Sequence, residues 1–139
     1  DPNDGRFDQY ERLFGGRRTD LNNTSLHGPL TPANLSVPGV RFSGEPTANT
    51  DFWLKLSAPS LASATDSWVI ARRRDPSGQS GQFLGTMIDG RLRWRPGPDG
   101  LEFEFGASAL FMDGFARDLP NAPSDDTTLF GYAQIAYGF

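Results

Sequence analysis

The chain has 139 residues and a net charge of −4, with 17 acidic and 13 basic side chains, no cysteine and one histidine, His27. These counts exclude a disulfide framework, a thiolate nucleophile and a thiolate metal site, and they leave little room for imidazole chemistry. No apolar run reaches the ~20 residues of a transmembrane helix, and the mean hydropathy of −0.47 suits both a soluble protein and an outer-membrane barrel, in which only alternate residues face lipid.

Residues 1–38 are expected to form an irregular segment that is extracellular or directed into a lumen. The segment contains "FGGRRTDLNN" and "HGPLTPANLSVPG", in which Gly, Asn and Pro favour turns over regular structure. It starts "DPNDGRFDQY", without an initiator Met or a signal sequence. We therefore expect a mature or trimmed product.

Five later segments alternate apolar with polar side chains, as half-buried β-strands do. They span 39–45, 51–57, 83–94, 101–112 and 127–139. The alternation predicts an all-β fold in which one sheet face is apolar. That face is expected to carry Val40, Phe42, Phe52, Leu54, Leu56, Leu84, Ile88, Leu92, Trp94, Leu101, Phe103, Phe105, Phe111, Leu129, Ile135, Tyr137 and Phe139.

The connections between these segments alternate in length. Residues 46–50 and 95–100 are short and rich in Pro, Gly, Asn and Asp, as tight hairpin turns require. Residues 58–82 and 113–126 are long, and a compact soluble domain rarely needs such loops. Short periplasmic turns with long extracellular loops are the layout of an outer-membrane barrel.

We interpret residues 39–139 as antiparallel strands of a transmembrane β-barrel. The smallest closed barrels have about eight strands, and an open edge in lipid leaves backbone groups unsatisfied. The barrel is therefore expected to close only with additional strands, from the same precursor or from another chain. A soluble antiparallel β-sandwich, with the apolar face as its core, is the alternative.

The order of several motifs resembles the C-terminal part of the alginate export domain family. They are "NLSVPGVRFSGEP", "DFWLKLSAPSLASATDSW", "RRDPSGQSGQFLG" followed by an alternating strand, and "LEFEFGASALFMDGFARD". The resemblance implies a barrel in the outer membrane of a Gram-negative bacterium that exports an anionic polysaccharide. It also implies contacts with lipid and lipopolysaccharide. A general porin for small solutes is the alternative function.

The C-terminal strand resembles the general signal that is read by the barrel assembly machinery. Its aromatic and aliphatic residues stand at alternate positions, Ile135, Tyr137 and Phe139. Many porins share this signal, so it implies the compartment and an assembly partner, and it does not imply the substrate.

The second face of the strands would line the lumen. Lys55 is the single lysine, so 12 of the 13 basic residues are arginine, whose guanidinium pairs bidentately with carboxylates. We expect arginines to meet the carboxylates of a uronic acid chain and Trp53 to stack on sugars. The loop arginines equally suit a solvated tip facing lipopolysaccharide. The predicted substrate pathway comprises Arg41, Trp53, Lys55, Arg72, Arg73, Arg74, Asp89, Arg91, Arg93, Glu102 and Glu104.

The tight turn at 95–100 predicts a register for the two strands that flank it. Trp94 is expected to face Leu101, Arg93 to face Glu102, and Arg91 to face Glu104. Such cross-strand charge pairs contribute roughly 0.2–1 kcal/mol each. The pairs can hold the register as a purely structural ladder, or their arginines can contact a passing anion.

Catalysis has little support in the sequence. Glu102 and Glu104 share a face at about 7 Å from strand rise, a spacing that any alternating strand produces. "DPSGQSG" lacks the Gly-Lys-Ser/Thr of a phosphate loop, and the Asp-rich stretches "DLPNAPSDD" and "DPNDG" lack an EF-hand pattern. We expect no enzyme, no cofactor, no metal site and no nucleic-acid partner.

Overall fold

The computed structural model describes residues 34–68, 71–97, 100–119, 122 and 124–138. Most of the segment 1–38 and the terminal Phe139 lie outside these residues. The described part is mainly antiparallel β-sheet, which confirms the all-β prediction.

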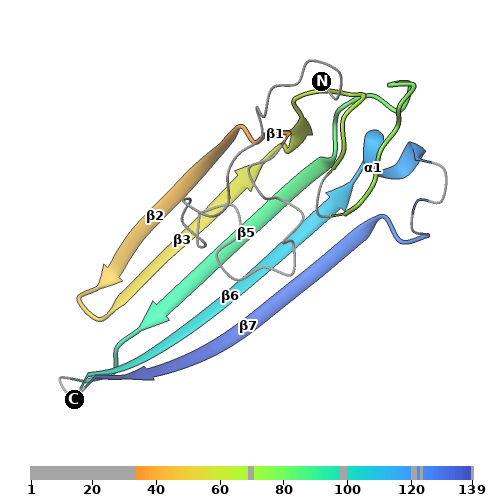
Figure 1. The fold of residues 1–139 in the computed structure, drawn as a ribbon. Helices are drawn as coiled ribbons and strands as arrows, with labels where there is room; N and C mark the ends of the chain where they lie inside the picture. Colours follow the sequence, from red (N-terminus) through yellow and green to blue (C-terminus); the bar gives the residue numbers. More distant parts are fainter. Residues whose placement is uncertain (1–33, 69–70, 98–99, 120–121, 123, 139) are drawn as a thin grey trace, which may run out of the picture.

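A five-stranded meander dominates the structure (Figure 1). Its strands are β2 (Gly39–Thr47), β3 (Thr50–Ser57), β5 (Gly85–Trp94), β6 (Leu101–Met112) and β7 (Thr127–Tyr137), in that spatial order. Every neighbouring pair is antiparallel. Each strand coincides with one predicted segment, with bounds that differ by up to two residues.

Strand β5 begins at Gly85, two residues later than expected. Gly85 has a φ of 136°, and a Cβ there would collide with the carbonyl oxygen of Phe111, so this position requires glycine. The turn of the backbone removes Leu84 from the apolar face on which it was expected. Leu84 is instead fully buried in a small core.

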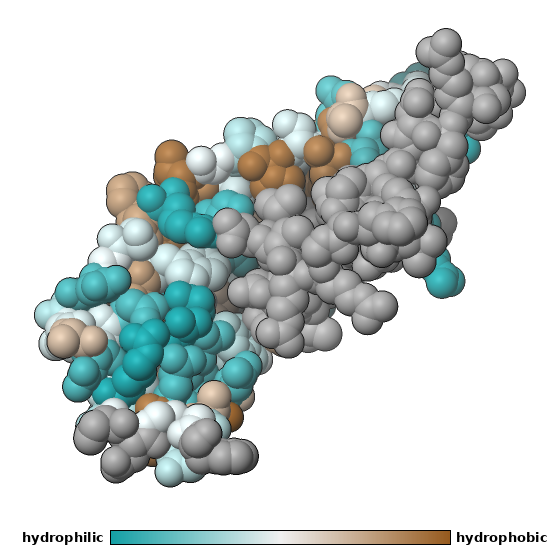
Figure 2. Space-filling view, turned by 60° about the vertical axis from the view of Figure 1, so that its left-hand side comes forward, coloured by the Kyte–Doolittle hydropathy of each residue, from teal (hydrophilic) through white to brown (hydrophobic). Residues whose placement is uncertain are grey.

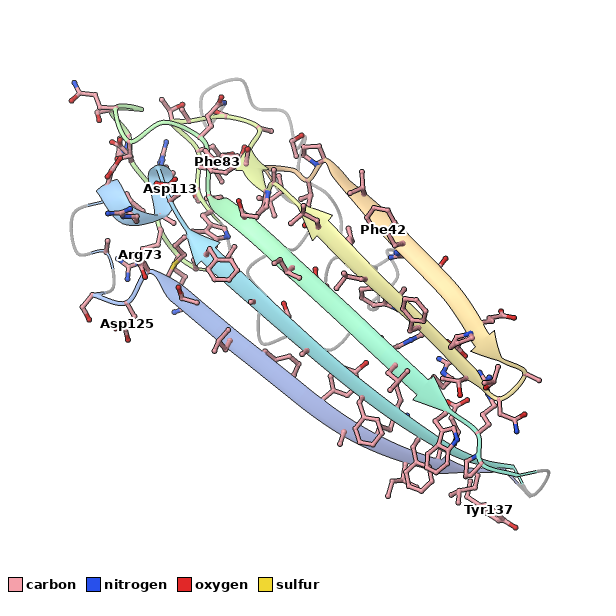
Figure 3. All side chains as sticks on the ribbon, turned by 180° about the vertical axis from the view of Figure 1, so that it is seen from behind. Phe42, Arg73, Phe83, Asp113, Asp125 and Tyr137 are labelled. Atoms are coloured by element: carbon pink, nitrogen blue, oxygen red, sulfur yellow. The ribbon has the colours of Figure 1, made fainter. Side chains whose placement is uncertain are left out.

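One face of the meander is apolar and exposed. Period-two alternation places large side chains of all five strands there, and Figure 3 labels two of them, Phe42 on β2 and Tyr137 at the end of β7. Within the described residues no second sheet covers this face. Its exposed side chains include Val40, Phe42, Phe52, Leu54, Leu56, Ile88, Leu92, Trp94, Phe105, Phe111, Leu129, Ile135 and Tyr137.

The long connections fold into a compact group of elements, called here the loop module, at one end of the sheet (Figure 1). It contains the two-stranded sheet of β1 (Leu35–Ser36) and β4 (Ser60–Leu61), and the short helix α1 (Phe115–Asp118). Regular structure thus occurs at residues 35–36, just before β2, and within the long connections 58–82 and 113–126. Their core comprises Leu61, Trp68, Leu84, Met87, Leu110, Phe115, Ala116 and Leu119.

The loop module packs on the polar face of the sheet. Met87 alternates with Asp89 on β5, and its register partner Leu110 alternates with Ser108 on β6, so both core residues share a face with the charged side chains. Asn34 ties the segment before β1 to the loop that follows β4. Its Nδ2 donates to the carbonyls of Ser63 and Ser67, each at 3.2 Å, and its Oδ1 accepts from the Ser63 N–H at 2.8 Å.

The described sheet is open, with edges at β2 and β7. Because it contains five antiparallel strands, its two edge strands run in the same direction, as Figure 1 shows. Closure with antiparallel neighbours throughout therefore requires an odd number of further strands. Among the described residues, no helix is both long and apolar enough to cross a membrane.

Candidate functional site

The strand register gathers the predicted wall residues on one face of the sheet. Arg41, Lys55 and Asp89 lie side by side on β2, β3 and β5. Trp53 lies beside Arg91 one rung closer to the short turns. The structure thus places all eight strand residues of the predicted pathway on the polar face.

The predicted register of β5 and β6 is wrong by two residues. Trp94 faces Phe103, Arg93 faces Glu104 and Arg91 faces Gly106. Leu101 and Glu102 pair with β7 instead, because the connection after Trp94 turns away: Arg95 N–H donates to the Asn49 carbonyl at 2.8 Å, and Pro96 has no N–H to donate. A slip of two residues keeps every side chain on its own face, so the predicted face is correct.

Asp51 joins two arginines that come from the neighbouring strand and its turn. Its Oδ1 lies 3.0 Å from Arg91 Nη2, and its Oδ2 lies 2.9 Å from Arg95 Nη2. The carboxylate therefore bridges the β2–β3 hairpin to the end of β5. Sequence analysis missed both Asp51 and Arg95, although each continues the period-two alternation, of Trp53 and Arg93 respectively, by one step.

Two glutamates of β6 complete the arrangement. Glu102 lies 2.9 Å from Arg95 Nε and 3.3 Å from Arg93 Nε. Glu104 Oε2 lies 2.9 Å from Arg93 Nη2 and 3.7 Å from Arg91 Nη1. The contacts close into a ring, called here the charge ring, in the order Asp51, Arg91, Glu104, Arg93, Glu102, Arg95.

The charge ring becomes more exposed toward the short turns. Glu104 is its most enclosed side chain, with 12% of its surface exposed, and Arg95 is its most open one, with 39%. Glu104 Oε1 also accepts a hydrogen bond from Tyr132 Oη at 2.8 Å. Tyr132 lies directly over Gly106, where a Cβ would collide with its ring. Tyr132 is a third residue that sequence analysis did not include in the site.

A groove of about 690 Å³ opens beside the charge ring. Figure 2 shows hydrophilic side chains gathered at this end of the molecule. The Trp53 ring in its wall is contacted by two guanidinium groups, Arg41 at 5.0 Å and Arg91 at 6.0 Å from the ring centre, so a sugar that stacks there competes with arginine. The groove is lined by Ser43, Gly44, Glu45, Thr47, Ala48, Thr50, Asp51, Phe52, Trp53, Arg91, Arg93 and Arg95.

Positive and negative charges balance on the described polar face. Its basic side chains are Arg41, Lys55, Arg91, Arg93 and Arg95, and its acidic ones are Glu45, Asp51, Asp89, Glu102 and Glu104. The arginines of the charge ring are thus matched one to one by carboxylates. Among the described residues, the side chain of Lys55 makes no hydrogen bond or ion pair, so its ammonium is available to a ligand.

The three loop arginines belong to the loop module and lie outside the strands. Arg74 Nε donates to the Thr65 carbonyl at 2.9 Å, and the backbone of Arg73 exchanges hydrogen bonds with Trp68. Arg72 is exposed, with a φ of 53°. The structure does not bring these residues into the rungs that hold Arg41 and Lys55.

Asp75 organises the turn that follows these arginines. Its carboxylate accepts hydrogen bonds from the Ser77 N–H at 2.9 Å, the Ser77 hydroxyl at 2.5 Å and the Ser80 N–H at 2.8 Å. The hydroxyl of Ser77 and the backbone of Ser80 hold the pKa of Asp75 well below its usual range. No group of three metal-ligating side chains occurs among the described residues, and "DPNDG" lies outside them.

Two residues of the expected assembly signal, Ile135 and Tyr137, lie on the apolar face. Ile135 is 69% exposed and Tyr137 61% exposed, while Phe139 is outside the described residues. Comparisons of the chain with models of protein families, with curated proteins and with solved structures find no match.

Proposed function

We propose that the chain forms part of the wall of an outer-membrane β-barrel channel that exports an anionic, uronic-acid-type polysaccharide from a Gram-negative bacterium. The observation that carries the proposal is the division of one sheet into two faces. One face is a continuous, exposed apolar surface across all five strands, and the other carries charged side chains beside a groove. Lipid suits the first face and water the second.

The strand lengths support a membrane-spanning wall. Strand β6 has 12 residues, which at ~3.4 Å per residue gives a length of ~40 Å and, at a tilt of ~40°, a height of ~30 Å. The hydrocarbon core of a bilayer is ~30 Å thick. Trp94 stacks on Phe103 at 5.5 Å near the short-turn end, where an interfacial aromatic girdle is expected.

The open edges at β2 and β7 indicate which kind of further strands would complete such a wall. Each unsatisfied backbone group in lipid costs several kcal/mol, so β2 and β7 need partner strands. Those strands are odd in number if all neighbours are antiparallel. A rotationally symmetric assembly of this sheet alone would pair β7 with β2 of the next copy in parallel, which disfavours it against further strands of the same precursor.

The substrate part of the proposal comes from the resemblance to the alginate export domain family and from two cations. Arg41 and Lys55 lie on adjacent strands of the polar face, within reach of successive carboxylates of a polymer. Transport requires each contact to be weak enough to release the chain. A single rung with these two cations releases the polymer more readily than a wall lined with many arginines would, and it therefore meets this requirement better.

The charge balance of the polar face favours a second candidate function, a general porin for small polar solutes. A balanced wall does not select anions by its field. The soluble β-sandwich is disfavoured because a sandwich buries its apolar face under a second sheet, whereas this face is exposed in the described residues.

Tryptophan fluorescence tests the face assignment. In membranes that contain brominated lipid, a variant that retains only Trp94 should be strongly quenched, because Trp94 is 46% exposed on the apolar face. The matched variant that retains only Trp53, on the polar face, should be quenched much less. Equal quenching of the two variants would contradict the membrane wall.

Conductance separates the two channel candidates. The protein as its gene encodes it is inserted into planar bilayers and challenged with uronic acid oligomers and with neutral sugars of equal length. Export of an anionic polymer predicts blockade by the uronate oligomers alone. Rapid permeation of small neutral sugars, with no blockade by uronates, would support the general porin instead.

A further inference from the structure

Each arginine of the charge ring is paired with carboxylates of the ring, although Arg91 Nε is buried and makes no hydrogen bond among the described residues. Each guanidinium contacts two carboxylates, and each carboxylate contacts two guanidiniums. An incoming carboxylate must displace one that is tethered within reach and therefore competes at a high local concentration. The ring is thus a section of wall that an anion passes with little binding. The ammonium of Lys55 lies one to two rungs away and has no internal partner among the described residues.

We propose that Asp51 determines the charge selectivity of this wall by neutralising Arg91 and Arg95 on the side that faces the groove. The inference rests on the proposed channel function. It goes beyond that function by assigning selectivity to one residue, Asp51.

The position of Asp51 distinguishes it from the other carboxylates of the ring. Glu102 and Glu104 belong to β6 and do not line the groove, whereas Asp51 and Glu45 do. Asp51 uses both oxygens, at 3.0 Å from Arg91 and at 2.9 Å from Arg95. It is therefore the ring carboxylate that lines the groove beside the two arginines with which it pairs, Arg91 and Arg95.

Glu45 supplies a matched control. It lines the same groove and carries the same charge, but within the described residues it makes no ion pair or hydrogen bond. Replacing either carboxylate by its amide changes the charge of the groove by one unit. Only the replacement of Asp51 also removes a carboxylate partner from two guanidiniums that line the groove.

The consequence of Asp51→Asn follows from the contacts that remain. Arg91 keeps one ion pair, the long 3.7 Å contact to Glu104, beside its contact with the Trp53 ring. Arg95 keeps its ion pair with Glu102. The two guanidiniums then offer donors to a uronate carboxylate in the groove. We expect the affinity of uronate oligomers for the channel to rise roughly tenfold, the scale of one added charge-assisted pair.

The test compares reversal potentials in a KCl gradient, and blockade by a uronic acid trimer, for the wild type, Asp51→Asn, Asp51→Glu and Glu45→Gln. Asp51→Asn should raise both anion permeability and trimer affinity, Asp51→Glu should restore wild-type values, and Glu45→Gln should raise anion permeability only slightly. Equal shifts for Asp51→Asn and Glu45→Gln, or no shift for Asp51→Asn, would overturn the role of Asp51 while leaving the channel in place. An inserted wild type that does not conduct would overturn the proposed function and with it this inference.

Arg95→Gln provides a second test if Asp51→Asn does not insert into the membrane. This change removes the most exposed guanidinium of the ring and frees one oxygen of Asp51. Selectivity should then shift toward cations. An unchanged reversal potential in Arg95→Gln would overturn the proposal.

Discussion

Removal of the Glu104 carboxylate should weaken the fold more than removal of any other charge on the polar face. Glu104 is the most enclosed member of the charge ring. It accepts from Arg93 Nε at 3.2 Å, from Arg93 Nη2 at 2.9 Å and from Tyr132 Oη at 2.8 Å. Glu104→Ala removes all three hydrogen bonds and leaves Arg91 and Arg93 with one carboxylate each, Asp51 and Glu102.

The expected loss follows from these contacts. Hydrogen bonds to charged groups contribute about 1.5–3 kcal/mol when desolvated, but the Arg93 side chain is 27% exposed, so screening reduces its pair to about 1 kcal/mol. The Tyr132 bond adds about 1 kcal/mol, and the contact with Arg91 about 0.5 kcal/mol. Glu104→Ala should therefore lower the free energy of unfolding by roughly 2–3 kcal/mol, and Tyr132→Phe by about 1 kcal/mol.

Urea unfolding of the folded protein in detergent micelles, followed by tryptophan fluorescence, measures both losses. Glu45→Ala is the control, because this exposed carboxylate has no described partner, and it should stay within about 0.5 kcal/mol of the wild type. A double-mutant cycle between Glu104 and Tyr132 should give a coupling of about 1 kcal/mol. A Glu104→Ala variant as stable as Glu45→Ala would refute the view that the ring locks β3, β5 and β6 in register.

Three further changes test other parts of the fold. Gly106→Ala should displace the Tyr132 ring and cost about 1–3 kcal/mol by overpacking, which the same urea titration measures, and an unchanged midpoint would contradict the close Tyr–Gly packing. Leu129→Asp, on the apolar face where this residue is 71% exposed, should reduce stability in lipid vesicles by about 1 kcal/mol if that face meets hydrocarbon, because the cost of a buried carboxylate is smaller near a strand end than at the bilayer midplane. No loss would count against a membrane wall. Hydrogen bonds lower the folded pKa of Asp75, so the order that its carboxylate confers on residues 75–80 is fully present above its ordinary pKa of 3.8 and is lost only as the pH falls well below that value. The amides of Ser77 and Ser80 should therefore be protected from hydrogen exchange at pH 4 in the wild type and not in Asp75→Asn. Equal exchange in the two proteins would exclude this role of Asp75.

Local pattern was sufficient to locate the strands and their faces. Alternation along "LEFEFGASALFM" reproduces the observed bounds of β6, Leu101–Met112, because a strand that separates two environments must place every second side chain on each side. The same rule placed Arg41, Lys55 and Arg91 on one face. An error of two residues in register left these assignments intact.

The pairing of charges required the tertiary structure. Asp51 and Arg95 are 44 residues apart in the chain. Their contact depends on the path of the chain after Trp94, which the hydrogen bond from the Arg95 N–H to the Asn49 carbonyl on the neighbouring hairpin directs. Alternation carries no information about such offsets. The closed ring, and hence the balanced polar face, therefore could not be read from the strands one at a time.

Alternation within each strand was enough to predict a two-faced antiparallel β-sheet with an apolar side, since alternation is a local property of a strand. Contacts between distant segments build the core of the long loops on the polar face around Met87 and Leu110, and they match Arg91, Arg93 and Arg95 with carboxylates. The core and the charge ring both consist of contacts between residues that are distant in the chain. Register, turn geometry and packing between strands and loops govern such contacts.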